Sequence, residues 1–301
     1  MPNSHNTVSR RIAPFAPLAI ALLMNRAVLS PPGGQTGETE SPTEVTAAVC
    51  DDVLDFQDCH TRFPTGCSSA GRYDAYLNLL KNQLIPPPAG ITGIEFLTRE
   101  KFQYLDSNTP KGLGRSNHAD FKDQLAQLGE GQVFGIVGYL YYAIKTGAES
   151  SNCQLTSNDE EGTNVDYHIG IGFDPPDPAL AQLLRAQKKL SRDQHRSLQQ
   201  SSVIVEMTPH YRFLYGGPGW TIDSLQNVLG RPVRVVGQLL NDNEHNLAAQ
   251  NCALATTPQE KLSCWRASTW ELHPVTRFEV CERASCDQNS TDWMELAAAQ
   301  P

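Results

Sequence analysis

Acidic residues and histidines recur at alternating positions in several stretches of this 301-residue chain. Asp166 and His168 lie two residues apart in VDYHIGIGF, and Glu271 and His273 lie two residues apart in WELHPVTRFEVC. In a β-strand this spacing puts both side chains on one face, about 7 Å apart. Carboxylates and neutral imidazoles at that separation could bind a divalent metal ion or act as an acid–base pair near neutral pH.

Two further stretches extend the pattern. Glu206 interrupts the apolar SVIVEMTP, and Asp242, Glu244 and His245 lie at and just beyond the end of RPVRVVGQLLND. In the clean strands these residues lie opposite the apolar ones, so we expect a shared, water-facing outer surface. The alternative is a strand face without a specific site, whose cross-strand contacts contribute only about 0.2–1 kcal/mol each. The candidate binding residues are Asp166, His168, Glu206, His245, Glu271 and His273, and the candidate ligands of a divalent metal such as zinc are His168, His245, Glu271 and His273.

The elements that must position these side chains follow from hydrophobic periodicity. Strands are predicted at 133–147, 165–173, 202–209, 231–242 and 270–281, and a helix is predicted at 221–230. Strand, strand, strand, helix, strand, strand is the order of an OB-fold, a five-stranded Greek-key barrel. Gly135 and Gly138 inside the first strand predict a bulge or bend of the kind that lets a barrel close.

Helical spacing dominates before the first strand. Helices are predicted in 71–84, 97–106 and 116–129, with Thr98 as the cap of the second and Gly129 at the end of the third. The predicted fold class is α+β, with a small disulfide-tied helical N-terminal region (49–130), an OB-like five-stranded β-barrel (131–282) and a C-terminal tail (283–301). The basic insertion at about 178–200 is predicted to be a solvated face, the segment 208–217 a surface loop, and His60 and His118 structural or exposed.

The first residues have the pattern of an export signal. Arg10 and Arg11 precede an apolar run from Ile12 to Met24, which is too short and too broken by prolines to span a bilayer. We assign residues 1–30 to the signal and residues 31–48, rich in Pro, Gly, Thr and Glu, to a disordered linker. The prediction is a secreted or periplasmic protein with no transmembrane helix in the mature chain.

Eight cysteines in the exported part favour disulfides. Short separations suggest Cys252 with Cys264 and Cys281 with Cys286, which leaves Cys153 to pair with one of three N-terminal cysteines. The alternative is a zinc site, although the spacings lack the close C-x₂-C pairs of structural zinc modules. The residues of that alternative are Cys50, Cys59, His60 and Cys67.

Charge and motifs restrict the function classes. The formal net charge is −9, so the chain as a whole does not attract phosphate backbones, and nonspecific nucleic-acid binding is disfavoured. The sequence contains no G-x-S-x-G elbow, Walker A loop, H-E-x-x-H or dinucleotide fingerprint. A cysteine nucleophile is disfavoured as well, because every thiol has a candidate disulfide partner.

Four segments, DYHIGIG, VIVEMTP, VRVVGQLLNDNEH and WELHPVT, resemble recurring stretches of a group of exported bacterial proteins. Members of that group carry a D-x-H strand, an acid-containing strand that ends in proline, and a terminal E-L-H-P-V, and they have no established activity. The resemblance implies one exported domain and supplies no reaction.

Three hypotheses for function remain open. The first is an exported module that binds a small ligand or metal through the Asp/Glu/His surface. The second is a metal-assisted hydrolase, for example of phosphodiesters, which would use His168, Glu206, His245, Glu271 and His273. The third is a structural envelope or secreted protein without a specific site.

Overall fold

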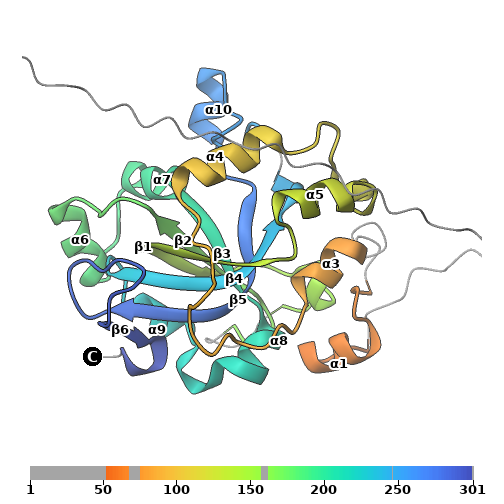
Figure 1. Cartoon of the computed structure of the whole chain (residues 1–301), viewed down its shortest axis with the longest axis horizontal. Helices are drawn as coiled ribbons and strands as arrows, with labels where there is room; N and C mark the ends of the chain where they lie inside the picture. The colour runs from red at the N-terminus through yellow and green to blue at the C-terminus, as the bar shows by residue number, and fades with distance from the viewer. Residues whose placement is uncertain (1–51, 68–74, 157–161, 246, 300–301) are drawn as a thin grey trace, which may run out of the picture. The chain divides into compact units, whose positions relative to one another are not determined.

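Five β-strands form a closed ring in the computed structural model, which describes residues 52–67, 75–156, 162–245 and 247–299 (Figure 1). Together with the surrounding helices they make an α+β fold, as predicted. The strands of the ring are β1 (Val133–Lys145), β2 (Tyr167–Gly172), β3 (Ser202–Met207), β4 (Pro232–Asn241) and β5 (Trp270–Cys281).

The pairing of the strands closes the barrel. β1 is antiparallel to both β2 and β4, β3 is antiparallel to β2, and β5 is antiparallel to β4. A parallel pairing of β3 with β5, where Val205 lies opposite Leu272, completes the ring. The predicted OB-like five-stranded barrel is therefore confirmed. A sixth strand, β6 (Trp293–Glu295), pairs with the end of β5 and was not predicted.

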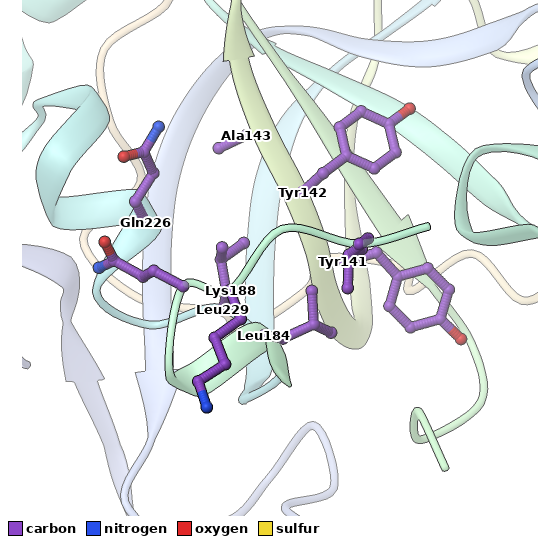
Figure 2. Close-up of a pocket in the computed structure, with 9 residues that line it drawn as sticks. Tyr141, Tyr142, Ala143, Leu184, Lys188, Gln226 and Leu229 are labelled. Atoms are coloured by element: carbon purple, nitrogen blue, oxygen red, sulfur yellow. The ribbon is translucent and has the colours of Figure 1, made fainter. Parts of the chain in front are cut away.

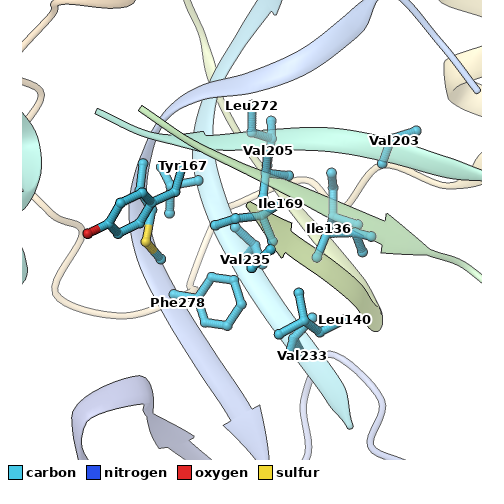
Figure 3. Close-up of a cluster of buried hydrophobic side chains, with 14 of the residues drawn as sticks. Ile136, Leu140, Tyr167, Ile169, Val203, Val205, Val233, Val235, Leu272 and Phe278 are labelled. Atoms are coloured by element: carbon cyan, nitrogen blue, oxygen red, sulfur yellow. The ribbon is translucent and has the colours of Figure 1, made fainter. Parts of the chain in front are cut away.

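The interior of the barrel is apolar, as the alternation of the strand sequences predicts. Figure 3 shows side chains from all five strands meeting inside the ring. Each fully buried aliphatic or aromatic side chain of this kind contributes roughly 1.5–3 kcal/mol of transfer free energy. The labelled members of this core are Ile136, Leu140, Tyr167, Ile169, Val203, Val205, Val233, Val235, Leu272 and Phe278.

The glycines of the strands permit close backbone approach. A Cβ on Gly138 would lie 2.5 Å from the carbonyl oxygen of Gly172, and a Cβ on Gly237 would lie 2.7 Å from that of Pro274. The irregularity in β1 lies between Leu140 and Tyr142, so the bulge is not at the two glycines that suggested it. The register of β4 with β5 also shifts around Gly237, beside a cis His273–Pro274 bond.

The helices largely follow the predicted pattern. Thr98 caps α4 by accepting from the Lys101 amide, Thr221 caps α9, and Gly129 ends α5 in a left-handed conformation. The α-helices are α1 (Phe56–Arg62), α3 (Ala75–Lys81), α4 (Arg99–Asn108), α5 (Lys122–Leu128), α6 (Pro178–Arg185), α7 (Arg192–Gln200), α8 (Pro209–Tyr211), α9 (Ile222–Gln226) and α10 (Pro258–Ser263). The short turns are η1 (Arg115–Phe121), η2 (Ser150–Asn152), η3 (Arg212–Gly216), η4 (Gly217–Gly219), η5 (Asn243–His245) and η6 (Leu296–Ala298).

The segment predicted as a surface loop at 208–217 is partly buried instead. It forms α8 followed by the π-helical turn η3, with Tyr211 fully buried in the main core. Arg212 is 9% exposed and lies over the ring of Tyr167 at 3.6 Å. Phe213 remains exposed. Gly216 and Gly217 suggested a loop, whereas Tyr211 and Arg212 attach the segment to the barrel.

Disulfides connect the elements as predicted where the structure describes them. Cys252 pairs with Cys264, and Cys281 pairs with Cys286. Cys59 of α1 pairs with Cys153, directly after η2, so the helical region is tied to the loop that follows β1. Cys67 is also in a disulfide. The alternative zinc site is wrong, because two of its thiolate ligands are oxidised.

Part of the sequence-based description lies outside the described residues. This holds for the export signal, the linker and Cys50. Within the described ranges, every helix is too short or too polar to traverse a lipid bilayer.

Candidate metal centre

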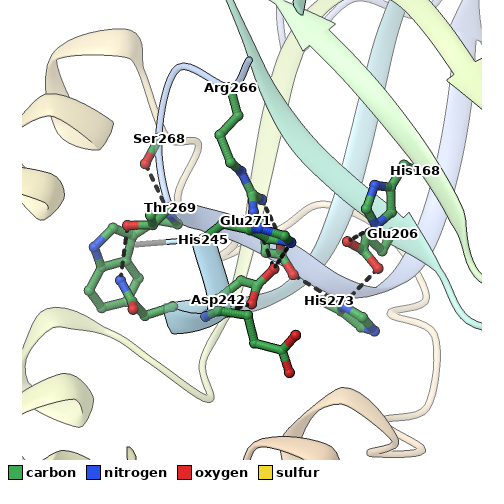
Figure 4. A network of polar contacts seen from close by, with 12 residues as sticks. His168, Glu206, Asp242, His245, Arg266, Ser268, Thr269, Glu271 and His273 are labelled. Carbon is green, nitrogen blue, oxygen red and sulfur yellow. Dashed lines mark hydrogen bonds and ion pairs between the residues drawn. The ribbon is translucent and has the colours of Figure 1, made fainter. Parts of the chain in front are cut away.

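The strand register brings the predicted site residues together on the outside of the barrel. His168 of β2 lies directly opposite Glu206 of β3 in the antiparallel ladder. The parallel contact between β3 and β5 pairs the residues next to Glu206 and Glu271, so the polar faces of the two strands meet. Figure 4 shows Glu206 between the two imidazoles of His168 and His273. Three adjacent strands therefore contribute to one cluster.

Glu206 is the central residue of this cluster. Its Oε1 lies 2.7 Å from Nε2 of His168, and its Oε2 lies 3.2 Å from Nδ1 of His273. Neither oxygen accepts a hydrogen bond of normal geometry from any described residue, although the side chain is fully buried. A carboxylate in this condition is unusual, because buried polar atoms are nearly always hydrogen-bonded.

A chain of ion pairs extends from His273 along the cluster. Nδ1 of His273 lies 3.1 Å from Oε1 of Glu271, whose other oxygen is bound by Nη2 of Arg266. Arg266 also donates to Oδ2 of Asp242 at 3.2 Å, and Nε2 of His245 lies 3.5 Å from the same oxygen. The guanidinium thus contacts two carboxylates at this end (Figure 4).

The helical region and the loop after β1 cover the other end. Glu149 places Oε1 4.0 Å from Nε2 of His168, and Nζ of Lys81 in α3 lies 3.6 Å from Oε2 of Glu149. Asn152 donates to Oδ2 of Asp166 at 3.2 Å. Because Cys153 is bonded to Cys59, the loop that carries Glu149 and Asn152 is fixed over the strands.

The cluster is buried, which differs from the expectation of a water-facing surface. Asp166, Glu206, Glu271 and His273 are 0% exposed. The side chains at the edge retain some contact with solvent, with exposures of 17% for His168, 21% for Glu149 and 25% for His245. Strand periodicity distinguishes the two faces of a strand, but it does not reveal that α3 and η2 cover the polar one.

Burial and neighbouring charges shift the pKa values of these groups in opposite directions. Burial lowers the pKa of His168 and His245 and lowers that of His273 well below 6.5, so His273 is neutral. Burial, with nearby carboxylates, raises the pKa of Asp166 and Glu206 well above normal and also raises that of Glu271. This is the behaviour of carboxylic acids that lack sufficient positive charge around them.

Two carboxylates of the cluster behave differently. Burial is the largest influence on Glu149 and Asp242 and opposes their ionisation, but Lys81 and the other neighbouring cationic groups together outweigh it, so the pKa of both groups is lowered. His168 contributes to this effect at Glu149, and His245 and Arg266 contribute at Asp242.

The charges in this cluster balance only if some of its carboxyl groups stay protonated, as the raised pKa values of Asp166, Glu206 and Glu271 imply. Lys81 and Arg266 are its two fixed cations among the described residues, and the three histidines have lowered pKa values. If all five carboxylates ionise, three negative charges are left uncompensated. The five carboxylates are Glu149, Asp166, Glu206, Asp242 and Glu271.

Three groups of potential metal ligands can be defined, and each contains Glu206. The first group is Glu149, His168 and Glu206, the second is Asp166, Glu206 and His273, and the third is Glu206, Asp242 and Glu271. Within each group the ligand atoms lie within 4.8 Å of one another. Arg266 already forms ion pairs with Asp242 and Glu271 in the third group, so the first two groups fit a metal ion better.

All six predicted site residues belong to this cluster, although His245 lies at its edge. Sequence reasoning missed Glu149, Lys81 and Arg266, which come from a loop, a helix and a loop and have no strand periodicity to mark them. The isolated histidines lie elsewhere. His118 is buried against Glu130 at 3.1 Å, and the ring of His60 lies tilted against that of His210 with centroids 4.2 Å apart.

A separate hollow lies on the outer face of β1, next to α6 (Figure 2). Tyr141, Tyr142, Leu184 and Leu229 supply most of its apolar lining, and Lys188 lies at its edge. It shares no residue with the acidic cluster. The basic insertion beside it is solvated as predicted, because Arg185, Lys188, Lys189 and Arg192 are all exposed.

Comparison with known proteins gives no relative from which a role could be transferred. No family model matches the chain, and neither a curated protein nor a solved structure matches it. The chemistry of the cluster is therefore the basis for assigning a function.

Proposed function

We propose that this protein acts outside the cytoplasm and binds a divalent transition-metal ion through Glu149, His168 and Glu206. The observation that carries the proposal is the state of Glu206. A fully buried carboxylate with two oxygens lacking aligned donors is costly, unless a cation that belongs there supplies the missing interactions.

The donor set supports a transition metal. Two carboxylates and one imidazole are ligands that suit zinc or manganese, whereas calcium and magnesium prefer oxygen ligands alone. Nε2 of His168 lies near both carboxylates, and its lowered pKa keeps the ring neutral, with a lone pair that can be donated to a metal.

Charge also supports the assignment. With all five carboxyl groups ionised, a divalent ion reduces the excess of three negative charges to one. The ion would bind beside Lys81, whose Nζ lies 3.6 Å from Oε2 of Glu149. Disulfides persist in oxidising compartments, so the pairs that the structure describes support an extracytoplasmic location.

The exposure of the first group favours a second candidate function, that of a metal-assisted hydrolase. His168 and Glu149 are partly exposed, so a metal held by these three ligands would keep a side open to solvent. Three protein ligands with an open position are typical of catalytic zinc sites, where the metal activates water. Metal-loaded protein should then hydrolyse a model phosphodiester such as bis(p-nitrophenyl) phosphate, and the Glu206→Gln variant should not.

Metal analysis of untagged protein that was purified in its folded state tests the proposed metal binding. After chelator treatment and titration with Zn²⁺ or Mn²⁺, we expect stoichiometric binding that Glu206→Gln abolishes and Glu149→Gln weakens at least tenfold. His195→Gln is the matched control, because His195 is an exposed histidine of α7 and should leave binding unchanged. Absence of stoichiometric metal in folded wild-type protein would overturn the proposal.

A further inference from the structure

The inner side of Glu206 presents a second set of ligands. Oε1 faces His168 at the partly exposed edge, whereas Oε2 faces His273 in the fully buried part of the cluster. The histidines come from β2 and β5, which flank β3 in the barrel. A carboxylate placed between two imidazoles has the arrangement of a bridging ligand.

Building on the proposed metal site, we propose that Glu206 bridges two metal ions, and that the second ion is held by Asp166, Glu206 and His273. The three side chains are fully buried, and their ligand atoms lie within 4.8 Å of one another. Two-metal sites with ions about 3.5–4 Å apart are a recurring arrangement in phosphatases and nucleases.

Distances within the second group fit shared coordination. Two ligand atoms at zinc–ligand distances of 2.0–2.2 Å in a tetrahedral site are separated by about 3.3–3.6 Å. Oε2 of Glu206 and Nδ1 of His273 are 3.2 Å apart, which is close to that separation. Oε1 of Glu271 lies 3.1 Å from the same nitrogen and is available as a further ligand.

The second group also has unsatisfied polar atoms. Oδ1 of Asp166 has no hydrogen-bond partner among the described residues, in addition to the two oxygens of Glu206. Neither Asp166 nor His273 forms an ion pair with a lysine or arginine of the described part. Arg266 pairs with the third group and Lys81 with the first, whereas Arg212 and Lys81 influence Asp166 of the second group without forming an ion pair with it.

The net charge of the cluster is compatible with a second divalent ion when all five carboxyl groups are ionised. One divalent ion changes the excess from three negative charges to one negative charge, and two ions change it to one positive charge. The two loaded states are therefore equally close to neutral. A single ion at the outer position would leave Asp166 as a buried carboxyl group without an ion-pair partner near Glu206, whereas a second ion would neutralise it.

Counting bound metal in the full chain separates this proposal from the one on which it rests. With Mn²⁺ as the probe, wild-type protein should bind two equivalents, Asp166→Asn and His273→Gln should bind one, and Glu206→Gln should bind none. Glu149→Gln weakens the outer ion only, and His195→Gln should keep both. Zero equivalents in the wild type would overturn both proposals, and saturation at one would overturn the bridging proposal alone.

Electron paramagnetic resonance of the Mn²⁺-loaded protein provides a second readout that does not depend on any variant folding. Two Mn²⁺ ions that share a carboxylate should give an exchange-coupled spectrum, whereas an isolated ion gives six hyperfine lines. We expect the coupled signal in the wild type and the six-line signal in His273→Gln. A six-line spectrum from wild-type protein at saturation would show that Glu206 does not bridge two ions.

Discussion

Removal of the Cys59–Cys153 disulfide should destabilise the protein more than removal of either other disulfide that the structure describes. This bond joins residues 94 positions apart, whereas Cys252–Cys264 spans 12 and Cys281–Cys286 spans 5. In the loop-entropy description, the stabilisation grows with the logarithm of the closed loop, and it is about 5, about 3 and about 2 kcal/mol for these three bonds.

The measurement is equilibrium urea unfolding of three paired Cys→Ala variants without reductant. Alanine is preferred to serine because Cys59 and Cys153 are 0% and 2% exposed, and a hydroxyl would be buried there without a designed partner. The Cys281→Ala/Cys286→Ala variant is the matched control, since it removes the same chemistry with the smallest loop. If the Cys59→Ala/Cys153→Ala variant loses no more stability than this control, the reasoning from loop length is wrong.

The same variant links stability to the site. Cys153 ends the turn that follows Glu149, and the disulfide fixes that turn to α1. Without it, Glu149 must be ordered at the moment of metal binding, and the affinity for the outer ion should fall. Binding to the Cys281→Ala/Cys286→Ala variant should be unchanged, because that disulfide lies at the end of β5 away from the cluster.

Two further predictions concern pH and packing. Burial, and then the neighbouring His210, lower the pKa of His60 from 6.5 to about 4, so the unfolded chain binds the extra proton more readily. The free energy of unfolding should therefore fall by about 3 kcal/mol as the pH drops from 6.5 to 4. Urea unfolding across that pH range measures this loss in the wild type and in His60→Gln. An equal loss in the variant would contradict the assignment to His60. Gly138→Ala should cost about 1–3 kcal/mol, because its Cβ would lie 2.5 Å from the backbone oxygen of Gly172. Gly90→Ala, with nothing within 4 Å, should change the unfolding free energy little, and equal effects of the two substitutions would refute the close-approach explanation.

The strands and one face of the site were predictable because both depend on local alternation. Asp166 and His168, or Glu271 and His273, share a face in any extended strand. Their meeting with Glu206 requires β3 and β5 to pair, which the order of elements predicted through the OB-like topology. Local pattern and topology together were sufficient for this part of the site.

The cover over the site was not predictable in the same way. Lys81 and Glu149 reach the cluster because α3 and the η2 loop lie on the outer face of the barrel, and a disulfide between distant residues ties the η2 loop to α1. Eight cysteines allow 105 pairings, so this long-range connection could not be deduced from the sequence. The burial of Glu206 and His273 follows from that connection, and it was therefore missed.

Burial of this cluster is difficult to reconcile with a purely structural role. Buried ion pairs contribute little net stability even when charges balance, and well-packed apolar side chains of similar volume often stabilise a fold more. Here five carboxylates face two fixed cations, and Glu206 lacks even aligned hydrogen bonds. The apolar interior of the barrel must offset the free-energy cost of burying these carboxyl groups. A protein that needed only a stable outer face would gain nothing from burying them. Acids and histidines with strongly shifted pKa values that cluster in one place are typical of functional sites. A bound cation would stabilise the folded state through the same residues that destabilise it when the cation is absent.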